Sequence, residues 1–142
     1  MTTVNAVMLV RDRPELTRQA IHTMLTNAGS AALNLTVVDD GSDDETRMLP
    51  EQLMTFHKMT NVSVVRLFPP VGIVGLCRNL GILASERLFG RGEYLYLADN
   101  DAYHLPGWLD TLLKVYENTE AHGIRLLGGI SRAASIPGIS RV

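Results

Sequence analysis

The sequence predicts an α/β protein whose mostly parallel sheet of four to five strands carries helices on both faces. Short apolar runs alternate with longer amphipathic segments, which is the order of repeated strand-helix-strand units. The apolar runs are continuous, as expected for strands that are buried on both faces of a parallel sheet. With 142 residues the chain has the length of one domain, so we expect residues 1–142 to form a single unit.

The first strand is expected at residues 4–10, a run of aliphatic and β-branched residues. Pro14 follows it and suits the first turn of a helix. Residues 15–27 carry apolar side chains at intervals of three and four, which predicts one buried helical stripe. The first strand and the helix after it therefore form the opening unit of the fold.

The second strand is expected at residues 35–38. Ser42 and Glu45 have the spacing of a capping box, which predicts a helix running towards residue 57. Pro50 falls inside that pattern and predicts a break there. The later elements are expected in the order strand 62–67, helix 72–88, strand 94–98, helix 106–116 and a fifth strand 124–130.

The composition excludes several classes of protein. Thirteen Lys and Arg residues against fifteen Asp and Glu give a net charge of −2, which argues against a generic nucleic-acid binder. The single cysteine, Cys77, excludes an internal disulfide framework and a cysteine-rich zinc site. No apolar run approaches the roughly 20 residues of a membrane span, and residues 1–5 carry no basic region of a signal peptide. We therefore expect a cytoplasmic protein without an integral membrane segment.

Acidic residues follow three of the predicted strands. In a parallel sheet built from right-handed crossovers, the carboxyl ends of the strands meet at one edge, where ligands bind. Two carboxylates roughly 6 Å apart repel each other by about 3 kcal/mol at an effective dielectric near 20, so a cation or a hydrogen-bonding ligand is needed to offset the charge. Asp99 and Asp101 alternate after the fourth strand and suit a hard divalent cation, whose charge would neutralise a substrate diphosphate.

Four motifs in the same order resemble those of family 2 glycosyltransferases. They are residues 37–46 (VVDDGSDDET), residues 13–16 (RPEL), residues 75–82 (GLCRNLGI), and residues 93–101 (EYLYLADND) with 105–109 (LPGWL). The resemblance covers nearly the whole chain. It implies the nucleotide-sugar-binding half of a GT-A fold, with a nucleoside diphosphate sugar as donor and a UDP-sugar favoured.

The resemblance also assigns roles by position. Asp39 would accept a hydrogen bond from the base, commonly from N3–H of uracil. Asp99 would lie against the ribose and the metal, and Asp101 would be the principal ligand of Mn²⁺ or Mg²⁺. Arg78 would approach the base or the diphosphate, and Asn79 would support that loop. The other residues expected at the nucleotide sugar are Arg11, Asp12, Asp40, Gly72 and Asn100.

The chain departs from the family pattern at several points. Arg11 stands where the family usually has Tyr, Asp12 where it often has Asn, and Val71 where Asn is common. No residue matches the carboxylate that acts as catalytic base in the family's acceptor-binding half, so we expect a donor-binding core without that half. An apolar sheet surface around residues 124–130 would favour self-association, so a homo-oligomer is one expected assembly.

The sequence therefore predicts a metal-dependent glycosyltransferase that moves a sugar from a nucleoside diphosphate sugar to an unknown acceptor hydroxyl. Two alternatives stay open at this point: a non-catalytic module that binds nucleotide sugars, and a nucleotidyltransferase-like enzyme. Receiver domains and haloacid dehalogenase-type phosphatases carry their acidic motifs after the first strand, and no phosphate-binding P-loop motif occurs in this sequence.

Three further residues are interpreted as structural. His104 follows the acidic motif and is expected to be a capping or loop residue rather than a metal ligand. Cys77 is expected to be a small buried apolar residue rather than a nucleophile. Trp108 is expected to anchor its helix to the sheet.

Overall fold

The computed structural model describes residues 1–43, 45–57 and 60–120 of the chain. Its contacts divide the chain into two compact units, Met1–Thr111 and Leu112–Val142. The first unit contains the four strands and three of the α-helices that the structure describes. No helix in the described ranges is long and apolar enough to cross a membrane. The expected fifth strand, residues 124–130, lies outside the described residues.

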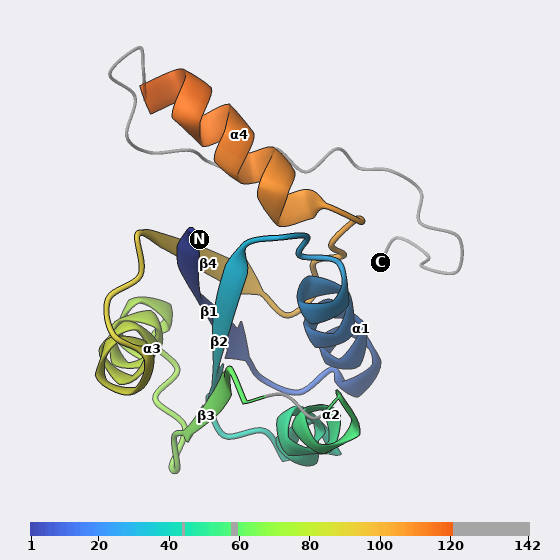
Figure 1. Ribbon diagram of the computed structural model, residues 1–142. Helices are drawn as coiled ribbons and strands as arrows, with labels where there is room; N and C mark the ends of the chain where they lie inside the picture. Colours follow the sequence, from blue (N-terminus) through green and yellow to red (C-terminus); the bar gives the residue numbers. More distant parts are fainter. Residues whose placement is uncertain (44, 58–59, 121–142) are drawn as a thin grey trace. The chain divides into compact units, whose positions relative to one another are not determined.

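The sheet has four described strands, and all neighbouring pairs are parallel. They are β1 (Thr3–Val10), β2 (Ala32–Asp39), β3 (Val62–Arg66) and β4 (Tyr94–Asp99), in the order β3-β2-β1-β4 (Figure 1). Because the strands are parallel, all four end at the same edge of the sheet. The predicted α/β class with a mostly parallel sheet is confirmed.

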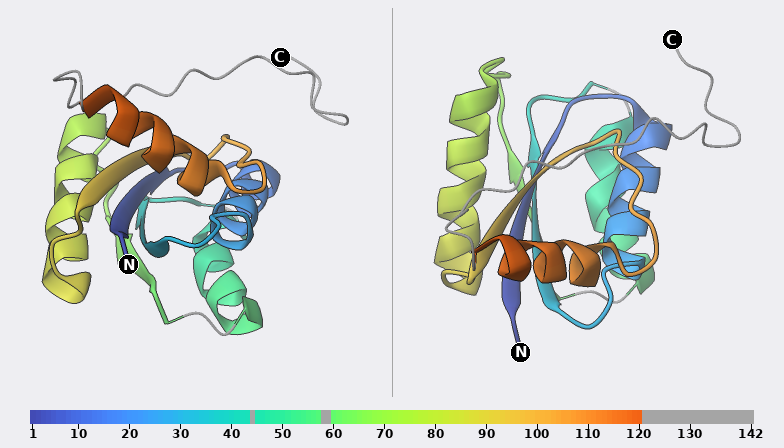
Figure 2. Two further views of the ribbon diagram at one scale, coloured as in Figure 1. Left: turned by 45° about the horizontal axis from the view of Figure 1, so that its top comes forward. Right: turned by 90° about the horizontal axis from the view of Figure 1, so that it is seen from above.

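Helices lie on both faces of this sheet, and the structure describes four α-helices in all. They are α1 (Pro14–Thr26), α2 (Leu49–His57), α3 (Val74–Phe89) and α4 (Trp108–Glu120), and a short 3₁₀ helix, η1 (Glu45–Met48), precedes α2. In Figures 1 and 2, α1 and α2 lie on one face and α3 on the other. The chain moves from β1 to β2 to β3 and then crosses to the far side of β1, so a right-handed connection places α3 on the opposite face. The order of the strands therefore reverses between β1 and β4, which is where α/β proteins bind ligands.

The capping box predicted at Ser42 and Glu45 is wrong. The hydroxyl of Ser42 accepts a hydrogen bond from the backbone N–H of Asp12 at 2.9 Å, so it serves the loop after β1. The α-helix begins only at Leu49, after η1, and Pro50 lies in its first turn. There the missing N–H of proline costs no helical hydrogen bond.

The last helix also begins later than expected. Residues 106 and 107 form a turn, with Gly107 at φ +71°, and α4 starts at Trp108. Trp108 is 9% exposed, and its indole N–H donates to the carbonyl of Met24 in α1 at 3.1 Å. The first turn of α4 is thus joined to α1, and the Trp108 ring also packs against Tyr96 of β4 at a centroid distance of 4.8 Å, as expected for an anchor to the sheet.

A tight contact joins α3 to the sheet. Val7 of β1, Val38 of β2 and Cys77 of α3 are fully buried in one cluster, as expected for a cysteine that acts as a small apolar residue. One turn further along α3, a Cβ added at Gly81 would meet side-chain atoms of Val7 at 2.5 Å and of Val38 at 2.6 Å. Gly81 therefore sets the distance between α3 and the two central strands.

Substitution of Gly81 by Ala tests this packing. The two β-branched valines are stiff, so we expect Gly81→Ala to destabilise the fold by about 1–3 kcal/mol through overpacking. Gly75→Ala is the matched control, because Gly75 lies in the same helix with open space around its Cβ position. Urea unfolding should show Gly75→Ala unchanged or more stable by up to about 1 kcal/mol. Equal stability of the two variants would contradict a close helix-sheet contact at Gly81.

Candidate functional site

The carboxyl edge of the sheet brings acidic side chains to both sides of β1. In the strand register, Asp39 of β2 lies opposite Val10, and Asp99 of β4 lies opposite Leu9. Two strand spacings place their Cα atoms about 10 Å apart. Leu9 packs on the face that α3 covers, so Asp99 leaves the sheet towards that face and Asp39 towards the other. A ligand reaching both carboxylates would lie across the end of β1.

The loop after β1 has an unusual backbone that is fixed by its neighbours. Asp12 and Arg13 both have positive φ, 54° and 62°, a conformation that costs energy for residues other than glycine. The Asp12 carboxylate accepts a hydrogen bond from the backbone N–H of Asp43 at 3.1 Å, and its carbonyl accepts one from the hydroxyl of Thr17 at 3.1 Å. Asp12 was predicted to touch the nucleotide sugar. In the structure its side chain joins the loop after β1 to the loop after β2.

Asp40 holds a second loop in place. Its side chain is almost fully buried and accepts hydrogen bonds from the backbone N–H groups of Val71 at 2.6 Å and Gly72 at 2.9 Å. Arg11 lies 3.9 Å from the same carboxylate. Gly72, also predicted at the nucleotide, is exposed with φ +69°. Both carboxylate oxygens of Asp40 therefore bind the loop between β3 and α3.

Asp39 is 3% exposed and is surrounded by two groups. Oδ1 accepts the backbone N–H of Ser42 at 2.9 Å, and Oδ2 lies 3.8 Å from Nε of Arg66. Arg66, the last residue of β3, forms an ion pair with Glu51 of α2, in which its Nη2 donates to Oε2 at 2.7 Å. Sequence reasoning missed both residues. The available signal was an arginine at the carboxyl end of a predicted buried strand.

Arg78 and Asp99 form a direct ion pair across the α3 face of the site. Nη2 of Arg78 donates to Oδ1 of Asp99 at 2.7 Å, and the Asp99 side chain is 68% exposed. Within the part of the chain that the structure describes, Nε of Arg78 is buried and has no hydrogen-bond partner. Asn79 follows on the same helix and is exposed. The pair thus retains an unused donor that is covered by protein.

The loop after β4 contacts the loop after β1. The amide of Asn100 donates to the hydroxyl of Thr17 at 2.8 Å, and Asp101 lies 3.5 Å from Nη1 of Arg13. Since Arg13 has a left-handed backbone, the strained turn after β1 is what brings its side chain to Asp101. The strand order reverses between these two loops, and the structure brings them together.

A divalent cation fits the donor chemistry of this edge but not as a site made of protein alone. Asp99 and Asp101 offer the carboxylate oxygens that Mg²⁺ and Mn²⁺ prefer. Among the described residues, no three His, Cys, Asp or Glu side chains form a metal-binding group. The remaining ligands of a bound ion would have to be water and substrate phosphate, which is usual for Mg²⁺.

His104 is part of a buried aromatic cluster, in agreement with the structural interpretation. It is 4% exposed, and its Nε2 lies 3.2 Å from the hydroxyl of Tyr96. Its ring centroid is 4.6 Å from that of Trp108, and its carbonyl accepts the amide of Asn27 at 2.7 Å. Burial lowers the pKa of His104 from 6.5 to about 4, so the imidazole is neutral at pH 7.

Cys77 is not set up as a nucleophile. Burial, followed by the negative charge of Asp40, raises the pKa of its thiol above 9.0. A thiol that resists ionisation is a poor nucleophile at neutral pH. Cys77 therefore belongs to the packing of α3 on the sheet.

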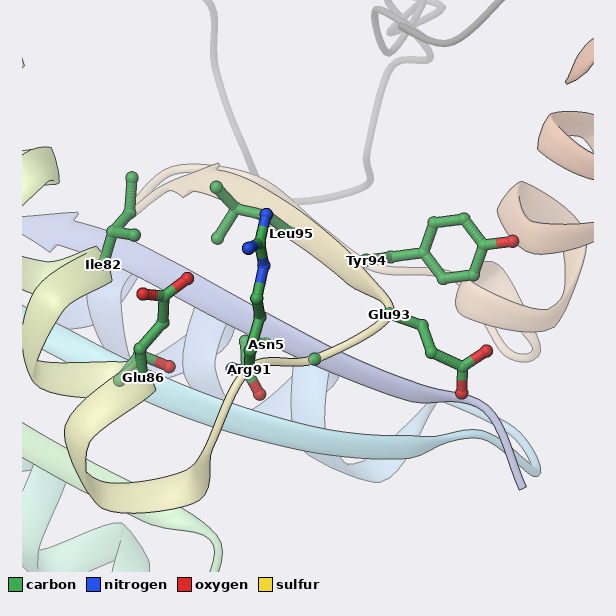
Figure 3. A pocket seen from close by; sticks show the side chains of 9 residues that line it. Asn5, Ile82, Glu86, Arg91, Glu93, Tyr94 and Leu95 are labelled. Atoms are coloured by element: carbon green, nitrogen blue, oxygen red, sulfur yellow. The ribbon is translucent and has the colours of Figure 1, made fainter.

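A pocket of about 180 Å³ lies at the opposite end of the sheet from the acidic loops. Its walls come from the second half of α3 and from the first residues of β1 and β4, with Ile82, Glu86 and Leu95 among them (Figure 3). Asn5 is already used there, since it donates to the carbonyl of Gly90 at 2.8 Å and accepts from Asn34 at 3.0 Å. This pocket is separate from the carboxyl edge and shares no residue with it.

The family model for glycosyl transferase family 2 matches residues 6–126, which include every residue of the candidate site and all of the described sheet except residues 3–5. The chain belongs to glycosyl transferase family 2. No curated protein matches its sequence closely enough to count as a relative.

Solved structures of TarS from S. aureus share the fold. A TarS 1-349 structure has a TM-score of 0.63 at 19% identity over 87% of this chain and 33% of that chain. A TarS 1-349 structure in complex with UDP-GlcNAc has a TM-score of 0.64 at 19% identity, and one in complex with UDP has 0.63 at 20%. The chain thus spans about a third of the length of these structures. The comparison confirms the predicted GT-A type of fold.

The buried His104 makes stability depend on pH. Its unfolded-state pKa of 6.5 exceeds the folded value of about 4, so the unfolded chain binds the proton more readily. The contribution of this difference is intact above pH 6.5 and is lost as pH falls towards 4, by roughly 3 kcal/mol in all. Urea unfolding between pH 7 and pH 4 should show this decline. His104→Gln should be less stable at pH 7 but should lose less on acidification; an equal decline would contradict the assignment.

Asp40 should be essential to the loop between β3 and α3. Asp40→Asn replaces one acceptor oxygen by an amide donor facing a backbone N–H, so we expect a loss of about 1–3 kcal/mol in urea unfolding. Hydrogen exchange of the Val71 and Gly72 amides should accelerate together with it. Asp43→Asn, at an exposed position of the same segment, is the control and should stay within about 0.5 kcal/mol of wild type. Unchanged protection of the two amides would show that Asp40 does not hold the loop.

Proposed function

We propose that this chain is the donor-binding portion of a metal-dependent glycosyltransferase that transfers a sugar from a UDP-sugar to an acceptor hydroxyl. The observation that carries the proposal is the placement of Asp39, Asp99 and Asp101 at the ends of β2 and β4, on either side of β1. Ligands of α/β proteins bind where the strand order reverses, and the chain belongs to glycosyl transferase family 2. We further propose that residues 1–142 act as one domain in the cytoplasm.

The donor nucleotide would lie across the end of β1. Asp39 would accept the N3–H of uracil through Oδ2, since Oδ1 is held by the backbone N–H of Ser42. Asp99 would lie against the ribose, and Arg78, which already reaches Asp99, would approach the diphosphate with its guanidinium. The TarS structures with UDP and UDP-GlcNAc support the choice of a uridine nucleotide.

Asp99 and Asp101 would hold Mn²⁺ or Mg²⁺ together with the substrate diphosphate. Such a cation, when bound, stabilises the charge that develops on the departing diphosphate. Arg13, 3.5 Å from Asp101, would orient that carboxylate and balance its charge. Asp12 and Asp40 would support the site without contacting the donor. Each uses its carboxylate to hold a loop in place through backbone N–H groups.

Transfer to a hydroxyl also requires a base that accepts the proton of the acceptor. The described residues at the carboxyl edge are committed to the donor side or to loop contacts. The acceptor and the base would therefore belong to the part of such an enzyme that faces the sugar.

Calorimetric titration with UDP, UDP-GlcNAc and GDP, each with and without Mn²⁺, tests the proposal. We expect UDP to bind at least tenfold more tightly with Mn²⁺, and Asp101→Asn to remove most of that gain. Asp43→Asn is the control and should bind as wild type does. Slow release of UDP from UDP-GlcNAc in the presence of Mn²⁺ would support a transferase. Binding without any release would favour a non-catalytic module, and equal binding with and without Mn²⁺ would contradict the metal role.

A further inference from the structure

A positively charged side chain lies beside Asp39 that none of the recognised motifs includes. Arg66 ends β3 directly opposite Asp39 in the strand register, and its Nε is 3.8 Å from Oδ2 of Asp39. Its side chain is 34% exposed, whereas that of Asp39 is 4% exposed. The separation exceeds a direct hydrogen bond, so the two groups lie side by side and can each meet one of two adjacent polar groups of a ligand.

The guanidinium of Arg66 is fixed in position by two elements on the α2 side. Nη1 and Nη2 face the two carboxylate oxygens of Glu51, and Nη2 also donates to the carbonyl of Arg47. Burial alone would raise the pKa of Glu51, but its hydrogen bonds with Arg66 and with the backbone outweigh this and hold the pKa below 4.5. Of the five N–H groups of an arginine, these contacts occupy three and leave Nε–H and one Nη1–H.

Asp39 offers acceptors rather than donors, and only one of its two carboxylate oxygens is left for a ligand. Its Oδ1 already accepts the backbone N–H of Ser42 at 2.9 Å, which leaves Oδ2 as the oxygen beside Arg66. The pair therefore offers one hydrogen-bond acceptor next to one donor group. Both are held by contacts with the protein before any ligand arrives, so binding does not have to order them.

The edge of uracil matches this arrangement, since it has a single donor, N3–H, between two carbonyl acceptors. We infer that Arg66 is a second base-reading residue: Asp39 accepts N3–H while Arg66 donates to a neighbouring carbonyl of the same uracil. This inference rests on the proposed function, and it adds the residue that selects the base.

Guanine would fit less well than uracil. It presents two adjacent donors, N1–H and the N2 amino group, and the second would need Oδ1 of Asp39, which Ser42 occupies. A donor left unpaired in a buried site weakens binding by about tenfold or more. Cytosine lacks N3–H and would place an acceptor against the Asp39 carboxylate. Adenine lacks the carbonyl that Arg66 would contact.

Equilibrium binding of UDP, GDP and ADP in the presence of Mn²⁺ tests the role of Arg66. Wild type should bind UDP at least tenfold more tightly than GDP or ADP. Arg66→Gln should weaken UDP about tenfold and change GDP less than twofold, so that the preference largely disappears. Arg91→Gln, an arginine that lines the pocket at the other end of the sheet, is the matched control and should leave all three affinities unchanged.

Thio-substituted nucleotides separate base reading from a purely structural role. Sulfur is a weak acceptor, so wild type should bind either 4-thio-UDP or 2-thio-UDP several-fold less tightly than UDP. Arg66→Gln should show no such loss for that same analogue. The comparison within wild type remains decisive if Arg66→Gln, which leaves Glu51 without its partner, proves too unstable to assay.

The outcomes distinguish the two proposals. If wild type binds none of the nucleotides, the proposed function fails and this inference fails with it. If wild type binds UDP but tolerates both thio substitutions, or if Arg66→Gln keeps the wild-type preference for UDP, only the role of Arg66 is overturned. Loss of UDP affinity in Arg66→Gln together with loss of sensitivity to one thio substitution supports it.

Discussion

Two consecutive buried carboxylates at the end of β2 hold the carboxyl edge of this protein together. Asp39 accepts the N–H of Ser42, and Asp40 accepts those of Val71 and Gly72. A buried carboxylate is stable only when such bonds replace its hydration, so the backbone amides of two loops are drawn to one point. Because those loops carry the groups proposed to bind the donor, the geometry of the site depends on these contacts.

The same edge shows how one type of residue can serve different purposes. Asp40 and Asp12 use their oxygens on backbone amides, whereas Asp99 and Asp101 stay exposed and pair with arginines. Carboxylates bound to the backbone fix the loops, and exposed ones remain able to exchange an arginine for a ligand. An acidic motif in the sequence therefore contains both kinds of residue, and only their partners tell them apart.

The aromatic cluster around His104 has a supporting part in this arrangement. His104 follows the acidic loop after β4 and is held by Tyr96, by Asn27 and by the hydroxyl of Thr23, which accepts the backbone N–H of His104. Its neutral ring packs against Trp108, whose indole is bonded to α1. The loop that carries Asp101 is thus fixed at its far end by packing rather than by charge.

The sequence by itself determined the order of strands and helices, the parallel sheet and the edge at which Asp39, Asp99 and Asp101 lie, because continuous apolar runs and the rule of right-handed crossovers are local and topological properties. It did not determine which oxygen of Asp39 is free, that Ser42 serves the loop after β1 rather than a helix, or that Arg66 and Glu51 belong to the site. The last two follow from contacts between residues 15 to 30 positions apart, such as Arg66 with Glu51 and Asp12 with Ser42. Only tertiary packing decides them, since a hydrogen-bonding side chain takes whichever partner the fold brings within about 3 Å.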